Sequence, residues 1–171
     1  MPPWSQPLEV ERLSRSAADV DFALELAELP GLRSLHGGVA GSVQGHVQFG
    51  REQGVAIAEL TFTGSATLEC QRCMRPMQQP LEVHARFALA ASETEAEQVP
   101  QELETVLAPG GRTTIAALVA EELLLTLPIV PLHAQGAEAH CAPAPAPAAA
   151  APGAQGETHK PFARLGELLK R

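Results

Sequence analysis

Alternation of apolar and polar residues dominates the first half of the chain. The alternating segments are residues 20–26, 43–49, 55–63 and 81–89. Such alternation is typical of β-strands that bury one face and expose the other. We therefore predict an antiparallel meander, with a further short strand near 103–107. In the continuing run 64–70, Gly64 predicts a bulge or a sharp bend.

One helical pattern stands out in the second half of the chain. Thr113 or Thr114 can cap this helix, apolar residues recur along it, and Pro128 ends it. Glu121 and Glu122 interrupt the apolar run and mark the predicted solvent face. Neighbouring helical residues point about 100° apart, so these two carboxylates cannot converge on one substrate atom. The pair therefore does not indicate acid–base catalysis.

These patterns predict an α+β fold over residues 1–141. We expect a bent antiparallel sheet, open or partly closed, with the 114–127 helix packed against it. Residues 92–104 carry repeated glutamates and predict an acidic loop in solvent. The chain is long enough for this single domain to bury a core.

The last part of the chain has a different composition. Residues 142–160 are mostly alanine, proline and glycine, which cannot build a core and predict a linker. In residues 161–171, Phe162, Leu165 and Leu169 fall on one helical face. We predict a short amphipathic C-terminal helix that needs a surface to dock on, because so short a helix is marginal alone.

The charge and the cysteine count narrow the class of protein. The net charge of −8 and the pI near 5.2 argue against a broad nucleic-acid-binding face, and we expect no DNA partner. The chain has no apolar run of membrane-spanning length and no secretory signal at its start. Three cysteines do not suit a disulfide framework. These features predict a cytoplasmic protein.

The most informative local feature is the Cys-x-x-Cys formed by Cys70 and Cys73 at the predicted hairpin tip. The two thiols can form a zinc knuckle, completed by Cys141 and by either His140 or His133. The only cofactor that the sequence indicates is therefore one Zn²⁺ ion. Two other interpretations stay open: a redox pair, although no helix N-terminus follows to lower a thiol pKa, and reduced cysteines without metal.

Three ordered motifs carry a family resemblance. They are residues 68–73 (LECQRC) followed by Pro76, residues 121–131 (EELLLTLPIVP) and residues 161–165 (PFARL). Together they resemble the YceD family of large ribosomal RNA subunit accumulation proteins. Richer members of that family carry more cysteines between the second and third motifs, whereas this chain keeps only Cys141 there.

The resemblance implies a non-enzymatic factor that supports accumulation or processing of large-subunit (23S-type) ribosomal RNA. Its expected partner is a ribosome-assembly protein or the large-subunit rRNA precursor. The candidate contact residues are Arg72 and Arg75 beside the cysteines and Phe162 and Leu165 in the C-terminal segment. The alternatives are a zinc-stapled adaptor without a direct RNA role and a Cys-x-x-Cys thiol oxidoreductase.

Overall fold

The computed structural model describes residues 3–29, 31–32, 39–134 and 141 of the 171-residue chain. Its strands are β1 (Leu8–Glu9), β2 (Asp19–Glu25), β3 (Ala40–Glu52), β4 (Val55–Glu69), β5 (Pro76–Ala90), β6 (Glu104–Leu107) and β7 (Arg112–Thr113). Its helical elements are η1 (Pro3–Ser5), α1 (Val10–Arg15), η2 (Leu26–Glu28), α2 (Glu93–Ala96), η4 (Pro109–Gly111) and α3 (Ile115–Thr126). No described helix has the length and apolar character needed to span a membrane.

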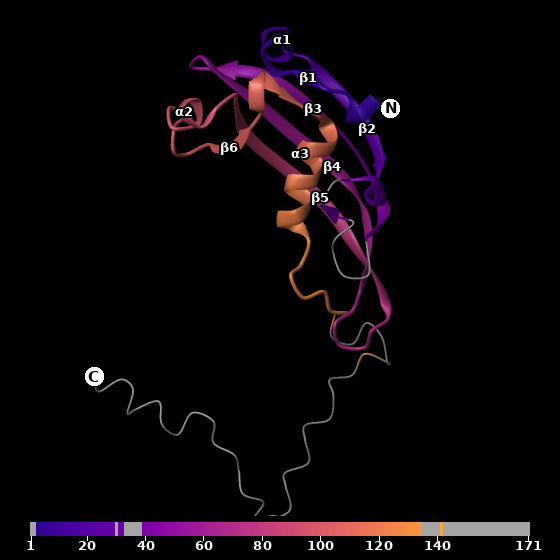
Figure 1. Cartoon of the computed structure of the whole chain (residues 1–171). Coiled ribbons are helices and arrows are strands. Elements are labelled where there is room, and N and C mark those ends of the chain that lie inside the picture. Colours follow the sequence, from indigo (N-terminus) through magenta and orange to yellow (C-terminus); the bar gives the residue numbers. More distant parts are fainter. Residues whose placement is uncertain (1–2, 30, 33–38, 135–140, 142–171) are drawn as a thin grey trace, which may run out of the picture.

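Five strands form one sheet in the order β2-β3-β4-β5-β6 (Figure 1). The first four pair antiparallel, so the predicted meander is confirmed. β6 runs parallel to β5, with Glu104 opposite Phe87, and β1 pairs separately with β7. The α+β class is confirmed, and because β2 and β6 end the sheet, the described strands form no closed barrel.

Helix α3 and one face of the sheet enclose the main core. Phe62 is 1% exposed, and its ring meets that of Phe22 edge-on at a centroid distance of 6.4 Å. A smaller apolar cluster of Ile57, Ala88 and Val99 lies apart from the main core. The large, fully buried side chains of the main core include Leu26, Leu29, Leu32, Val47, Leu60, Phe62, Phe87, Ile115, Leu118, Val119 and Leu123.

The predicted bulge at Gly64 is wrong. Pairing runs through Gly64 without a break, opposite Val43 on β3 and Leu81 on β5. A Cβ atom at this position would lie 2.2 Å from the backbone oxygen of Ser42. Glycine is therefore required here for the close approach of two strands, which sequence alone does not distinguish from a bulge.

The predicted helix is confirmed over Ile115–Thr126. The Thr114 side chain caps it by accepting a hydrogen bond from the Ala117 amide at 3.0 Å. The solvent face was predicted wrongly in part, because Glu122 is only 8% exposed while its neighbour Glu121 is exposed. Helix α2, capped by Ser92, occupies part of the acidic segment 92–104.

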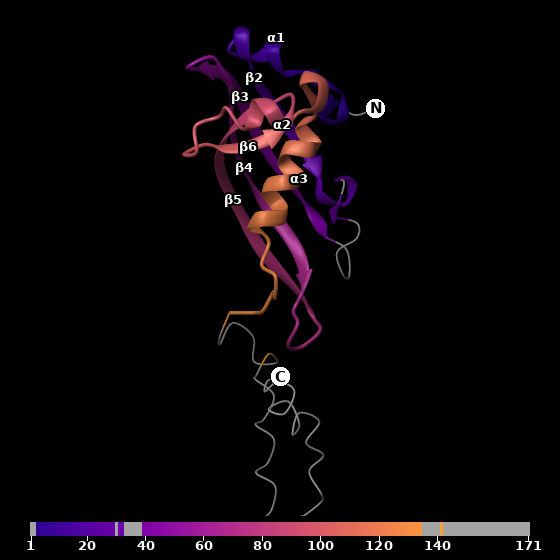
Figure 2. The same ribbon diagram turned by 60° about the vertical axis from the view of Figure 1, so that its left-hand side comes forward.

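The tip of the β4–β5 hairpin and helix α1 lie at opposite ends of the sheet (Figures 1 and 2). The β4–β5 hairpin extends beyond the end of α3, and the chain that follows α3 runs along it toward the tip. Helix α1 lies at the other end, where an ion pair between Glu11 and Arg51 joins it to β3. The hairpin tip and helix α1 therefore form two separate surfaces of the molecule.

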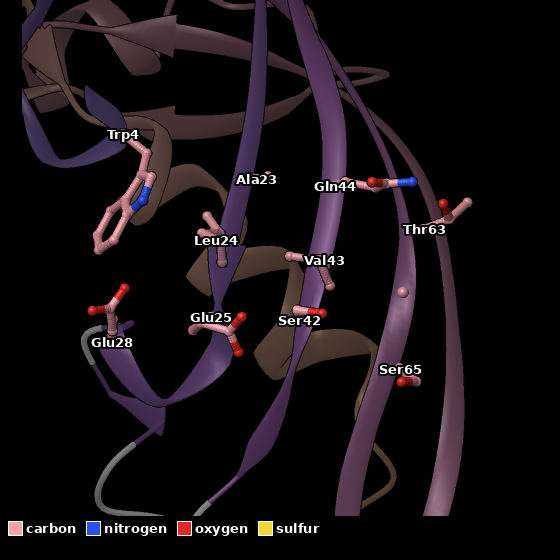
Figure 3. A pocket seen from close by; sticks show the side chains of 11 residues that line it. Trp4, Ala23, Leu24, Glu25, Glu28, Ser42, Val43, Gln44, Thr63 and Ser65 are labelled. Atoms are coloured by element: carbon pink, nitrogen blue, oxygen red, sulfur yellow. The ribbon is translucent and has the colours of Figure 1, made fainter. Parts of the chain in front are cut away.

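A polar hollow of about 590 Å³ lies between these ends, on the β2–β4 part of the molecule (Figure 3). Trp4 and Glu28 stand on one side of it, and hydroxyl and amide groups of β3 and β4 stand on the other. The described residues that line it include no cysteine or histidine, and the three cysteines lie elsewhere.

Candidate metal centre

The hairpin tip places the Cys-x-x-Cys in a tight turn between β4 and β5. The Cys70 amide donates a hydrogen bond to the Arg75 carbonyl at 2.9 Å, and the Met74 amide donates one to the Cys70 carbonyl at 2.8 Å. Met74 adopts a positive φ of 57°, which reverses the chain direction. The turn brings the side chains of Cys70 and Cys73 to the same side of the tip.

The segment after α3 brings the other two candidate ligands to this turn. Pro128 ends the helix, and the Gln71 amide donates a hydrogen bond to the Pro131 carbonyl at 2.9 Å, which fixes the extended segment against the tip. His133 then lies with its Nδ1 atom 3.4 Å from the Cys73 sulfur. Cys141 lies with its sulfur 3.6 Å from the Cys70 sulfur.

The ligand atoms of Cys70, Cys73, His133 and Cys141 all lie within 4.8 Å of one another. Tetrahedral zinc with Zn–S near 2.3 Å and Zn–N near 2.0 Å requires about 3.7 Å between sulfurs and about 3.5 Å between sulfur and nitrogen. The observed 3.6 Å and 3.4 Å agree with both values. A disulfide would need sulfurs about 2.05 Å apart, and the three cysteines are free. The donor set therefore fits a structural zinc ion.

These four side chains are shielded from solvent, although the tip carries exposed apolar residues. Cys70 is 0% exposed, Cys141 6% and His133 7%, and Cys73 is half-buried. Ile129, close to them in the chain, is 99% exposed. Burial of this kind suits a closed structural metal site, in which protein ligands fill every coordination position.

The pKa values of the Cys70 and Cys141 thiols are shifted in opposite directions. Burial acts to raise the pKa of the Cys70 thiol, but hydrogen bonds to its sulfur outweigh burial and lower that pKa to about 5. These bonds come from the backbone of His133, Arg72 and Cys73 and from the Cys141 thiol.

The Cys141 thiol behaves in the opposite way. Burial, hydrogen bonds to Cys70 and Cys73 and repulsion from their charges raise its pKa to about 11. Ionisation of the Cys141 thiol is therefore disfavoured when no cation is present. A divalent ion would remove that penalty, since a coordinated thiol is deprotonated outright.

The remaining site residues predicted from the sequence fall into three groups. Arg72 is half-buried, and its guanidinium donates a hydrogen bond to the Cys141 carbonyl at 3.1 Å, so it helps to hold that ligand in place. Arg75 is exposed at the tip. His140, Phe162 and Leu165 lie outside the described residues, and their roles stay predictions.

Fold and site together define a small α+β protein with a cysteine–histidine cluster at the tip of a long hairpin. The family model described as "Large ribosomal RNA subunit accumulation protein YceD" matches residues 58–169, and the chain belongs to this family. A protein of Haemophilus influenzae with the same name is 35% identical over 75 residues, which cover 43% of this chain and 41% of that protein. The similarity thus spans less than half of that relative. No solved structure matches the chain.

Proposed function

We propose that this chain is a non-catalytic, cytoplasmic factor that supports accumulation of large-subunit (23S-type) ribosomal RNA. The observation that carries this role is the family match over residues 58–169, whose description names large ribosomal RNA subunit accumulation. Its partner is a ribosome-assembly protein or the large-subunit rRNA precursor. The chain acts by contact, and the one close thiol–imidazole pair named above, Cys73 and His133, serves as part of a metal-ligand set.

A Zn²⁺ ion held by Cys70, Cys73, His133 and Cys141 fixes the contact surface. Support comes from the convergence of the four ligand atoms from three segments, which are separated by up to 71 positions in the sequence. The ion's chemistry here is structural: it ties the segment after α3 to the hairpin tip. Arg75 and Ile129, which are both exposed, then face a partner in a fixed arrangement.

The alternative function, a thiol oxidoreductase, depends on how accessible the thiols are to a substrate. Exchange with a substrate requires an accessible thiolate, and the thiol with the lowered pKa, Cys70, is 0% exposed. An oxidoreductase would turn over a dithiol reductant and lose that activity in Cys70→Ser. We expect no turnover in the native chain. An adaptor without an RNA role would instead bind its partner equally well when ribosomes are absent.

The metal proposal is tested by elemental analysis of purified, untagged protein, with a thiol count on the same sample. We expect about one zinc per chain and thiols that react only after denaturation. His133→Ala should lose the zinc, whereas His140→Ala, which removes the alternative ligand, should retain it. Retention of zinc in His133→Ala with loss in His140→Ala would overturn the assignment of the fourth ligand.

The cellular role is tested by depletion. We expect the ratio of large-subunit to small-subunit rRNA to fall, and to recover when the wild-type chain is restored. Cys70→Ser should restore it poorly, whereas His84→Ala, which changes an exposed β5 residue away from the tip, should restore it fully. An unchanged ratio after depletion would contradict the proposed function.

A further inference from the structure

Four arginines gather at the end of the molecule opposite the cysteine cluster. Arg12 and Arg15 lie on α1, Arg51 near the end of β3 and Arg112 at the start of β7, and all four are exposed. Three of them line a hollow of about 720 Å³, whose far wall is formed by Gly110 and Gly111. Space is open beside both glycines, so a large ligand can approach this wall closely.

This end differs in charge from the rest of the protein. All seven basic residues in the described part of the chain are arginines, and four of them lie here. Among the described residues, the acidic ones that line the hollow are Glu9 and Glu11 against three arginines, which leaves an excess of positive charge. Glu52, the neighbour of Arg51, is turned toward Arg86 and pairs with it. A local positive site therefore stands on a chain of net charge −8.

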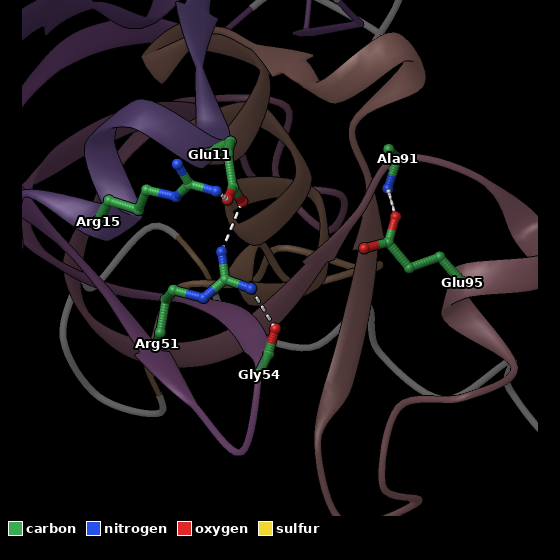
Figure 4. Close-up of polar contacts among 6 residues, drawn as sticks. All are labelled: Glu11, Arg15, Arg51, Gly54, Ala91 and Glu95. Carbon is green, nitrogen blue, oxygen red and sulfur yellow. Dashed lines mark hydrogen bonds and ion pairs between the residues drawn. The ribbon is translucent and has the colours of Figure 1, made fainter.

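Glu11 orients two of these guanidinium groups. One of its oxygens lies 2.7 Å from Arg15 Nη2, and the other lies 2.5 Å from Arg51 Nη1 (Figure 4). Arg51 also donates a hydrogen bond to the Gly54 carbonyl, which fixes its plane. A guanidinium has five N–H donors, so most donors on both groups stay available for a ligand. Arg12 has no ion pair within the described residues.

We propose that Arg12, Arg15, Arg51 and Arg112 form a phosphate-binding site that holds the backbone of an RNA. Guanidinium forks match the geometry of phosphate oxygens, and several forks spaced around an open hollow suit successive phosphates of a chain. That the ligand is RNA rests on the proposed function. Arg12, Arg15 and Arg51 lie outside the matched range 58–169, so the site belongs to this chain and not to the matched motifs.

The net negative charge of the chain weakens phosphate binding at this site but does not abolish it. Charges more than about 8 Å apart are largely screened at physiological ionic strength. The distant carboxylates therefore act weakly on the hollow, and the nearby ones are Glu9 and Glu11. With at most four arginines available, we expect modest affinity and a shallow salt dependence, since both scale with the number of neutralised phosphates.

The test measures binding of a fluorescein-labelled RNA hairpin to the full chain by anisotropy, from about 50 to about 200 mM salt. The double variant Arg12→Gln, Arg15→Gln should weaken binding and lower the slope of log affinity against log salt by about 1.4 to 1.8. The control is Glu82→Gln, which changes one exposed charge on β5 outside the arginine cluster and the hairpin tip and should leave the slope unchanged. Glu9→Gln, which frees Arg112 from its ion pair, should strengthen binding.

Three results would overturn the inference: no saturable RNA binding by the wild type, a slope change in Glu82→Gln as large as that in the double variant, or displacement of the RNA by inorganic phosphate at equal phosphate concentration. The last would assign the site to free phosphate. Complementation separates this failure from failure of the proposed function. If depletion lowers the rRNA ratio and the double variant restores it fully, the site is not used but the function stands. If depletion leaves the ratio unchanged, the function fails, whatever the RNA affinity.

Discussion

The two ends of the β4–β5 hairpin are held in place by different kinds of interaction. Near α3, Phe62, Phe87 and Leu123 pack into a large apolar core, and each is at most 1% exposed. At the tip, burial is just as complete for Cys70 and nearly so for His133, but polar ligand atoms lie at its centre.

This difference has a consequence for stability. An apolar core spreads its free energy over many contacts, each of which is small. In the proposed metal site, the free energy would be concentrated in a few ligand atoms and one ion, so chelation alone would remove it. We therefore expect the core to respond to truncation of side chains and the tip to respond to chelation and pH.

Truncation in the core should have the largest effect. Phe62→Ala removes a ring that contacts Phe22 and lies in the centre of β4, and we expect a loss of about 3–5 kcal/mol in the free energy of unfolding. Urea unfolding followed by circular dichroism measures this loss. Thr63→Ala, on the exposed side of the same strand, is the control and should change stability by less than about 0.5 kcal/mol. Similar losses in the two variants would show that this face of β4 is not the core.

Removal of the metal should have the next largest effect on stability. The loss should fall on a different part of the molecule, the hairpin tip. With free zinc at about 100 times its dissociation constant, its removal should lower the free energy of unfolding by about 2.7 kcal/mol. Amide hydrogen exchange should show where the loss falls. Protection should disappear at Gln71 and Met74, whose amides are bonded across the tip, and persist at Leu60 in the core. Loss of protection along all of β4 would contradict a separate tip.

Sequence periodicity predicted much of the core end. Alternation identified β2, β3, β4 and β5 because each of these strands has one buried face, and Thr114 and Pro128 marked the limits of α3. The parallel pairing of β6 was missed because four residues carry no signal of strand direction. The burial of Glu122 was missed because the sequence does not show which neighbours cover a polar residue on a helix.

The structure brings four of the five predicted metal ligands together, and metal binding by them stays a prediction. The Cys-x-x-Cys spacing indicated two ligands, and Cys141 was the only further thiol. The sequence left His133 and His140 open as the fourth ligand, because it does not show the backbone path after Pro128. Among the described residues, a hydrogen bond from the Gln71 amide to the Pro131 carbonyl and one from Arg72 to the Cys141 carbonyl hold this path at the tip, whereas His140 lies outside the described residues. The arginine cluster was even less apparent from the sequence, because the three elements that carry it, α1, β3 and β7, come together only in the fold.

Substitution of Glu122 should have the smallest effect on stability. It tests how a buried carboxyl group on α3 affects the core end of the molecule. Burial, followed by repulsion from Glu104 and Glu121, raises its pKa above the ordinary value of 4.5. The native state therefore holds this proton more tightly than the unfolded state does. Between the two pKa values the native state binds more protons, so stability falls as the pH rises. The contribution of the protonated carboxyl is complete below about pH 4.5 and is lost as the pH passes the native pKa.

Glu122→Gln keeps the shape of the side chain and removes this titration. We expect it to raise the free energy of unfolding at pH 7 by roughly 0.5 kcal/mol and to change it less at pH 4. Glu121→Gln removes the same charge from the exposed neighbour and should give a smaller gain. A loss of stability in Glu122→Gln at pH 7 would mean that the carboxylate makes a favourable contact in the native state. In that case a polar contact would add to the stability of the core end, which packing of apolar side chains alone does not indicate.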